Sequence, residues 1–187
     1  MKLYHGSPNR NIKKFKIIPR ENNTPEFGDG IYFTSNIKQA KLWSCSNSKQ
    51  GAIYEIDIEI NKLKGKKLES DDLFYYLSYL NRINLKDLID ECLDELNGVD
   101  YVFGKMLKDI NNFKIYGEKF NNGDIELDEF KKQTKCFEKR YNQYCFKTKE
   151  AIDLINDSLD KIYYTSRVKK NIEIVNSIKF NNHYEDI

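Results

Sequence analysis

The chain has 187 residues, enough for one domain with a sizeable hydrophobic core but hardly for two. Its 31 basic and 29 acidic residues nearly balance, so the formal net charge of +2 gives no case for nucleic-acid binding through overall charge. The four cysteines form no CxxC pair and there are only two histidines, so the sequence predicts no metal site. Since no membrane-spanning stretch or signal peptide is seen, we expect no membrane association and a cytoplasmic protein with reduced thiols.

The first third of the chain alternates short apolar runs with loops. Its strands are predicted at residues 3–7, 15–18, 30–35 and 52–60. The last of these alternates apolar and acidic residues from Tyr54 onward, as a half-buried strand does. The stretch 19–30 is rich in Pro, Asn and Gly and predicts a mobile loop. A helix is expected over 37–45, with Asn36 as its N-cap.

The middle of the chain is mostly helical in its pattern. Apolar residues at helical spacing predict helices at 71–80 and 85–96. A further helix is expected near 106–110, and a polar surface helix at 127–140. One short strand is expected at 101–104. The stretch from about residue 61 to 140 is therefore predicted to be a helical insertion.

Strand character returns near the end of the chain. The predicted elements are a strand at 143–148, a helix at 149–159 and a strand at 161–168. Residues 171–187 show no clear periodicity and predict a polar tail. Strands at both ends with helices between them favour a single α+β domain over 1–187, with a mostly antiparallel or mixed sheet.

Polar groups inside three of the strand-like runs are candidate functional residues. His5 can offer a ring nitrogen to a sugar hydroxyl, and Gly6 lets a ligand approach the backbone closely. Tyr32 can stack on a flat heteroaromatic ring, and Gln143 places an amide at the start of an apolar strand. Each also has an ordinary explanation when taken alone: a structural histidine, a core tyrosine and an edge residue in solvent.

Taken together, five segments in order resemble the ADP-ribosyltransferase superfamily, which is known for a His–Tyr–Glu triad on a split β-sheet that holds NAD. The resemblance is closer to a branch of bacterial and phage proteins known as a domain of unknown function with an ADP-ribosyltransferase-like fold. It spans roughly residues 2 to 160. The matching segments are 4–7 (Tyr-His-Gly-Ser), 27–34 (Phe-Gly-x-Gly-x-Tyr-x-Thr), 39–43 (Gln-Ala-x-x-Trp), 100–104 (Asp-x-Val-x-Gly) and 143–148 (Gln-x-x-Phe-x-Thr).

The resemblance implies NAD as a substrate and a role for each matching residue. His5 would hold the adenosine ribose, Gly6 would bind the nicotinamide amide through its backbone, and Tyr32 would stack on the nicotinamide ring. Gln143 takes the place of the triad glutamate, so the implied catalytic residues are His5, Tyr32 and Gln143. The other residues implied to line the NAD cleft are Ser7, Gly30, Thr34, Ser35 and Asn36.

The glutamine is a departure from the triad. An amide can accept the hydrogen bond of a ribose hydroxyl, but it carries no charge to face the cation that forms as nicotinamide leaves. Catalysis would then depend on positioning. Asp109 is the first choice for a compensating acid, and Asp29 and Glu150 are the others, although each carboxylate is also typical of a solvated or capping position.

Three functions stay open. The first is an ADP-ribosyltransferase acting on an intracellular macromolecule, protein or nucleic acid, as a toxin of a toxin–antitoxin or phage-defence system with a small antitoxin protein as partner. The second is a binding module that senses NAD or ADP-ribose without turnover. The third is an enzyme on the related tRNA phosphotransferase scaffold, which the few Arg and His residues of this chain disfavour.

Overall fold

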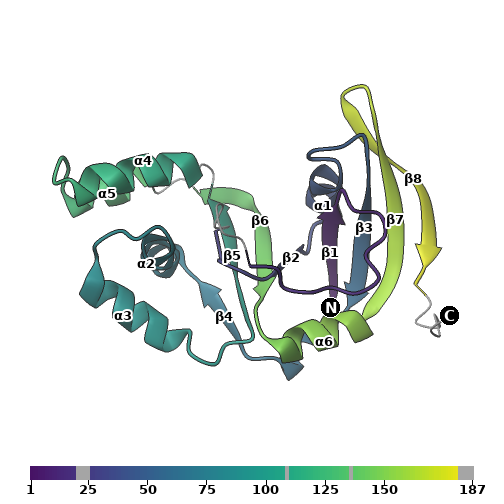
Figure 1. Cartoon of the computed structure of the whole chain (residues 1–187), viewed down its shortest axis with the longest axis horizontal. Coiled ribbons are helices and arrows are strands. Elements are labelled where there is room, and N and C mark those ends of the chain that lie inside the picture. The colour runs from purple at the N-terminus through teal and green to yellow at the C-terminus, as the bar shows by residue number, and fades with distance from the viewer. Residues whose placement is uncertain (20–25, 108–109, 135–136, 181–187) are drawn as a thin grey trace.

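The computed structural model describes residues 1–19, 26–107, 110–134 and 137–180. Within these residues the chain forms six α-helices, one short 3₁₀ helix and eight strands, and all the strands belong to one open, mixed sheet (Figure 1). The predicted α+β class is confirmed.

The elements follow one another in strand-rich and helix-rich stretches. The strands are β1 (Lys2–Ser7), β2 (Ile31–Thr34), β3 (Gln50–Asp57), β4 (Gly65–Leu68), β5 (Tyr101–Leu107), β6 (Phe137–Phe146), β7 (Leu159–Val168) and β8 (Asn171–Lys179). The helices are α1 (Ile37–Ser44), the 3₁₀ helix η1 (Ile60–Lys62), α2 (Ser70–Leu80), α3 (Lys86–Glu95), α4 (Ile110–Asn121), α5 (Leu127–Thr134) and α6 (Lys149–Asp157).

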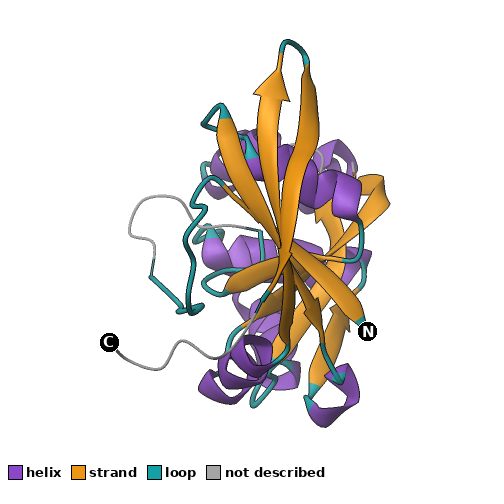
Figure 2. Cartoon of the chain, turned by 90° about the vertical axis from the view of Figure 1, so that its right-hand side faces the viewer, coloured by secondary structure: helices purple, strands orange, loops and turns teal. Residues whose placement is uncertain are grey.

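The order of strands in the sheet is β4-β5-β6-β2-β1-β3-β7-β8. Only the β4–β5 pair is parallel among the pairs of the described strands. Figure 1 shows α2 to α5 gathered beside β4, β5 and β6, and α1 beside β1 and β3. Figure 2, turned by 90°, shows the strong twist with which the strands fan out. The two ends of the sheet are thus covered by different helices.

The sheet is narrowest between β1 and β2. These strands pair only at Tyr4 and Thr34, whereas β1 and β3 pair at six positions and β2 and β6 at four. The strand β2 is therefore held mainly by β6, and one residue pair joins the part of the sheet that contains β6 to the part that contains β3.

Two hydrophobic clusters stabilise the two parts. The first packs under α2 to α5 and includes Phe27, Leu77, Phe113, Phe130 and Cys145. The second packs around α6 and includes Leu3, Phe33, Tyr54, Phe146 and Ile155. Successive residues of a strand point to opposite faces, so Tyr32 packs against the first cluster and Phe33 belongs to the second. The strand β2 thus connects the two cores.

One expectation for the N-terminal third is wrong. Residues 15–18 form no strand, because the side chain of Asn156 replaces a partner strand: it accepts from the Phe15 N–H at 2.7 Å and donates to the Phe15 carbonyl at 3.2 Å. The loop predicted over 19–30 is confirmed for residues 19 and 26–30, and Phe27 within it is completely buried. Its residues 20–25 lie outside the described part of the chain.

Element boundaries in the middle differ from the sequence expectation. No helix covers 106–107, because β5 continues to Leu107 between β4 and β6, and α4 begins at Ile110. The helix expected at 127–140 ends at Thr134, and β6 begins at Phe137. Gln143 therefore lies inside a strand and does not begin one. The stretch 61–140 contributes β4, β5 and part of β6 to the sheet as well as four helices.

The predicted polar tail is also wrong for the residues that the structure describes. Asn171–Lys179 is the strand β8, which pairs antiparallel with β7 across a tight turn at Lys169 and Lys170. Lys169 has φ of 55°, the left-handed conformation that such a hairpin turn requires. Residues 181–187 lie outside the described part.

Candidate functional site

The strand order brings the three candidate segments together. β1 carries His5 and Gly6, β2 carries Tyr32 and Thr34, and β6 carries Gln143, and these strands are neighbours in the order β6-β2-β1. Thr34 pairs with Tyr4 on one side and with Gln143 on the other. The chain thus places segments from its start and its last quarter side by side at the narrow point of the sheet.

His5 is oriented by the backbone of β2. Its Nδ1 lies 2.7 Å from the carbonyl oxygen of Tyr32. A carbonyl only accepts, so Nδ1 carries the proton and Nε2 is the acceptor in the neutral ring. The ring packs edge-on against Phe15, with centroids 5.1 Å apart, and at 5.5 Å from Phe33. The imidazole therefore has a fixed tautomer and a fixed plane.

Tyr32 anchors the segment that precedes β2. Its hydroxyl donates to the Gly28 carbonyl at 2.7 Å and accepts from the Phe27 N–H at 3.0 Å. Its ring lies parallel to that of Phe27 at a centroid distance of 6.3 Å. Burial raises the pKa of the Tyr32 hydroxyl far above its usual range, so the hydroxyl stays protonated. Gly28 has φ of 73°, which suits glycine at this turn.

Thr34 and Asn36 fix the start of α1. The Thr34 hydroxyl donates to Gln39 Oε1 at 2.6 Å and accepts from the Asn36 N–H at 3.1 Å. Asn36 caps the helix, as predicted, by accepting from the Lys38 N–H at 2.9 Å. Ser35, between them, is exposed. These contacts give both residues a structural role. That role was predicted for Asn36 but not for Thr34.

Close packing explains the glycines of this region. A Cβ on Gly6 would lie 1.9 Å from the Ala40 carbonyl oxygen of α1, and one on Gly30 would lie 2.5 Å from Cys145 Sγ. Gly6 therefore lets α1 lie directly on β1, and Gly30 lets the start of β2 pass close to β6. Ser7 accepts from the Asn9 N–H at 3.1 Å and so closes the turn after β1.

Gln143 is buried, with 5% of its surface exposed, and it contacts a carboxylate. Its Nε2 donates to Glu26 Oε2 at 3.1 Å. The sequence analysis missed Glu26, because an acid in a Pro- and Asn-rich loop is typical of a solvated residue; its place directly before the Phe-Gly-x-Gly motif was the available signal. Of the acids that it did name, Asp29 and Glu150 are exposed, and Asp109 lies outside the described residues.

A family model covers the part of the chain that carries these residues. It matches residues 1–156, which include all the candidate site residues, and its description is "Protein of unknown function (DUF3990)". The chain belongs to the DUF3990 family. No curated protein and no solved structure matches it. In this DUF3990 protein the match ends inside α6, so β7 and β8 follow the matched region.

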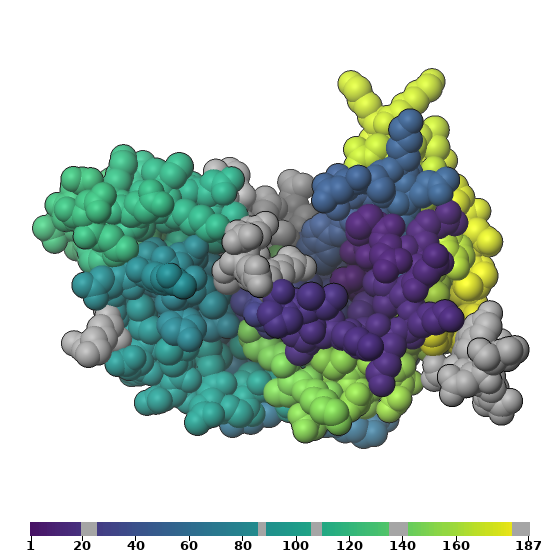
Figure 3. Space-filling view, viewed as in Figure 1, coloured from purple at the N-terminus to yellow at the C-terminus, as the bar shows by residue number. Residues whose placement is uncertain are grey.

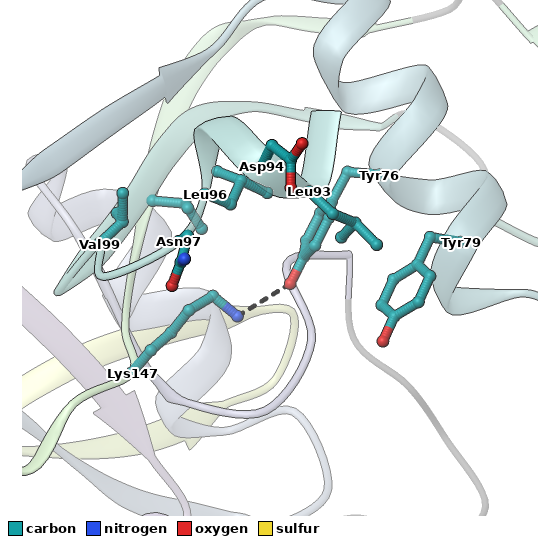
Figure 4. A pocket seen from close by; sticks show the side chains of 9 residues that line it. Tyr76, Tyr79, Leu93, Asp94, Leu96, Asn97, Val99 and Lys147 are labelled. Carbon is teal, nitrogen blue, oxygen red and sulfur yellow. Dashed lines mark hydrogen bonds between the residues drawn. The ribbon is translucent and has the colours of Figure 1, made fainter. Parts of the chain in front are cut away.

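A pocket of about 330 Å³ lies behind the segment that Tyr32 anchors. It is lined by Tyr76, Tyr79, Leu93, Asp94, Leu96, Asn97, Val99, Val102 and Lys147 (Figure 4). Lys147 donates to the Tyr76 hydroxyl at 3.0 Å, and both side chains also donate to the Phe27 carbonyl. None of the predicted site residues lines this pocket of the DUF3990 protein. Two of the residues that do line it, Tyr76 and Lys147, hold the backbone at Phe27.

Two kinds of feature are absent from the described residues of this DUF3990 protein. No group of three or more His, Cys, Asp or Glu side chains there could hold a metal ion. Within the same residues, none of the helices is both long enough and apolar enough to cross a membrane.

Proposed function

We propose that this DUF3990 protein is an NAD-dependent mono-ADP-ribosyltransferase, which separates nicotinamide from NAD and passes ADP-ribose to a macromolecule. The observation that carries the proposal is the meeting of three motif segments on adjacent strands: His5 and Gly6 on β1, Tyr32 on β2 and Gln143 on β6. Because β6 and β1 are far apart in the sequence, this meeting depends on the fold and is independent of the motif spacing.

The fixed histidine gives the proposal its chemistry. With Nδ1 held by the Tyr32 carbonyl, Nε2 of His5 is an acceptor for a ribose hydroxyl of the dinucleotide. The backbone of Gly6 would bind the nicotinamide amide, and the ring of Tyr32 would stack on the nicotinamide. Gln143 would accept from a hydroxyl of the second ribose, next to the bond that breaks.

The biological setting belongs to the same proposal. We infer an intracellular toxin, held in check by a small antitoxin protein, whose acceptor is a protein or a nucleic acid in the cytoplasm. The motif similarity supports this setting.

Gln143 favours a second candidate function. An amide at the position of the triad glutamate supplies no charge of its own, which suits a module that binds NAD or ADP-ribose without turnover. The two candidates differ in one measurable property, the release of nicotinamide.

The test combines calorimetry with a nicotinamide-release assay. Wild-type protein should bind NAD in the micromolar range typical of enzyme substrates and should release nicotinamide. His5→Ala should weaken NAD binding by about 1–3 kcal/mol, because the ribose hydroxyl loses its acceptor. Gln143→Ala should abolish release with little change in NAD affinity, the pattern of an interaction made in the transition state.

The matched control is Gln133→Ala on α5. Gln133 Nε2 also donates to a glutamate, Glu129, at 2.6 Å, but it lies outside the candidate site. This variant should bind and release as wild type does. Absence of NAD binding at millimolar concentration would reject both candidate functions, whereas binding without release in the wild type would leave only the binding module.

A further inference from the structure

Glu26 stands at a fixed point of the chain, directly before a fully buried residue. The next residue, Phe27, has none of its surface exposed. Its N–H donates to the Tyr32 hydroxyl at 3.0 Å, and its carbonyl accepts from the Tyr76 hydroxyl at 3.2 Å and from Lys147. Figure 3 shows the first residues of the chain, in purple, on the right of this face, reaching toward the helical part on the left. The backbone that follows Glu26 is thus held from several sides.

The Glu26 side chain extends from this anchor to Gln143. The distance from Gln143 Nε2 to Glu26 Oε2 is 3.1 Å, and Gln143 is buried beside Thr34 of β2. A hydrogen bond to an ionised carboxylate is stronger than one between neutral groups, and more so where water is excluded. The contact therefore brings a negative charge to the residue that the proposed function places beside the reacting bond.

We propose that Glu26 supplies the carboxylate of this site, with Gln143 as the positioning residue that holds it there. The inference rests on the proposed function and names the source of the charge that Gln143 lacks. A glutamate of the loop before β2 thus supplies the negative charge that the triad glutamate supplies from a strand. Asp29 and Glu150 are poorer candidates, since both are exposed.

The step that Glu26 would assist conserves atoms and charge. The bond between ribose C1′ and the nicotinamide nitrogen breaks, and its electron pair goes to the nitrogen, so nicotinamide leaves as a neutral molecule. The ribose becomes an oxocarbenium-like cation that faces the Glu26 carboxylate. A lone pair of the acceptor then forms the new bond to C1′, and the acceptor releases its proton to solvent. Glu26 changes only the stability of the cation.

The test moves the charge from one partner to the other. Glu26→Gln should lower nicotinamide release by about a hundredfold, the typical loss of one electrostatic group at a transition state. NAD affinity should stay within a few fold. In the double variant Glu26→Gln with Gln143→Glu, the carboxylate returns from the strand side of the same hydrogen bond, and most of the release should return. The single variant Gln143→Glu should gain little, because two adjacent carboxylates raise each other's pKa and one stays protonated.

The matched control is Glu129→Gln, which changes the acceptor of the Gln133 hydrogen bond on α5 and should leave release unchanged. A second readout needs no turnover: a cationic iminoribitol, a ribose analogue with a protonated ring nitrogen, should bind at least about tenfold more weakly to Glu26→Gln than to wild type. Melting temperatures close to that of wild type confirm that each variant folds.

The outcomes separate the inference from the proposed function. Normal release in Glu26→Gln, with an active wild type, overturns the role of Glu26 and leaves the transferase. Unchanged iminoribitol binding in Glu26→Gln also overturns it. A wild type that binds NAD but neither releases nicotinamide nor prefers the cationic analogue overturns both the transferase and the role of Glu26.

Discussion

Thr34 illustrates how a candidate ligand residue can serve the fold at the same time. Its hydroxyl donates to Gln39 Oε1 at 2.6 Å and accepts from the Asn36 N–H, and both Thr34 and Gln39 are buried. The hydroxyl therefore joins β2 to the first turn of α1. A ligand that bonds the Thr34 hydroxyl would have to compete with these two bonds.

Thr34→Val should lower the free energy of unfolding by about 1–3 kcal/mol, because the isosteric side chain removes the hydrogen bonds of the Thr34 hydroxyl to Gln39 Oε1 and to the Asn36 N–H. Chemical denaturation measures the difference. Thr34→Ser, which keeps the hydroxyl, is the control and should lose less. Equal stability of Thr34→Val and wild type would show that the two bonds add nothing to the fold.

Single residues also show what the sequence could predict about the site. The motifs singled out His5, Tyr32 and Gln143 as candidates, because glycines and polar groups inside strand runs are visible in a linear pattern, and the structure places their strands side by side. The partners of their side chains were not visible. The contact between Gln143 and Glu26 joins β6 to a loop near the start of the chain, and no local spacing encodes a contact of such sequence separation.

At the scale of elements, the close packing of α1 against the sheet depends on the glycines beneath it. A Cβ on Gly6 would lie 1.9 Å from the Ala40 carbonyl oxygen, and one on Gly51 would lie 1.8 Å from the Ser44 carbonyl oxygen. Both obstacles are backbone atoms of one helix, which cannot rotate away as a side chain can. The helix therefore lies as close to β1 and β3 as backbone contact allows.

Gly6→Ala should force α1 away from β1 and destabilise the protein by about 1–3 kcal/mol or more, as overpacking does. Thermal unfolding followed by circular dichroism checks this. Gly123→Asn is a suitable control, since a Cβ there meets nothing within 4 Å and asparagine tolerates its φ of 79°. If Gly6→Ala melts like wild type and loses only NAD binding, the glycine serves the ligand and not the helix.

The elements that the sequence predicted well are those with a clear period. The alternation from Tyr54 onward predicted a strand there, but the expected half-buried strand to residue 60 is wrong: β3 ends at Asp57 and is buried from Gly51 to Ile56, because Glu55 bonds Lys2 and Tyr163. The helix predicted at 149–159 is confirmed as α6. The strand β8 was missed although Ile172, Ile174 and Ile178 recur with a strand's period of two; it lies at the edge of the sheet, and only Ile172 of its nine residues is buried. The ends of β5 and β6 were missed because their extent is decided by pairing with each other, which lies outside any local window.

For the whole molecule, buried tyrosines link stability to pH. Burial raises the pKa of Tyr54 from its ordinary value of 10 to about 12, and it raises the pKa of Tyr32 and Tyr163 in the same direction. The folded state thus holds these protons more tightly than the unfolded state does. Their contribution to stability is complete below about pH 10 and is lost as the pH rises toward 12.

We therefore expect cooperative unfolding at alkaline pH, with tyrosinate absorbance and loss of circular dichroism appearing together. Tyr54→Phe removes one of these titrations, although it also removes the hydrogen bonds of the hydroxyl to Asn9 and Ile12. Its stability at neutral pH should be lower, and its loss of stability between pH 10 and 12 should be smaller. Ionisation of all thirteen tyrosines near pH 10 without unfolding would contradict this account.

The strand order has a consequence for the chain while it is being synthesised. β2 meets its main partner β6, and β3 meets its outer neighbour β7, only after the whole helical middle has been made. A nascent chain that has left the ribosome as far as β3 therefore presents two open strand edges, and such edges readily pair with other chains. Long-range pairings of this kind also form slowly. The first sixty or so residues thus spend most of translation in need of protection, by a chaperone or by the ribosome surface itself.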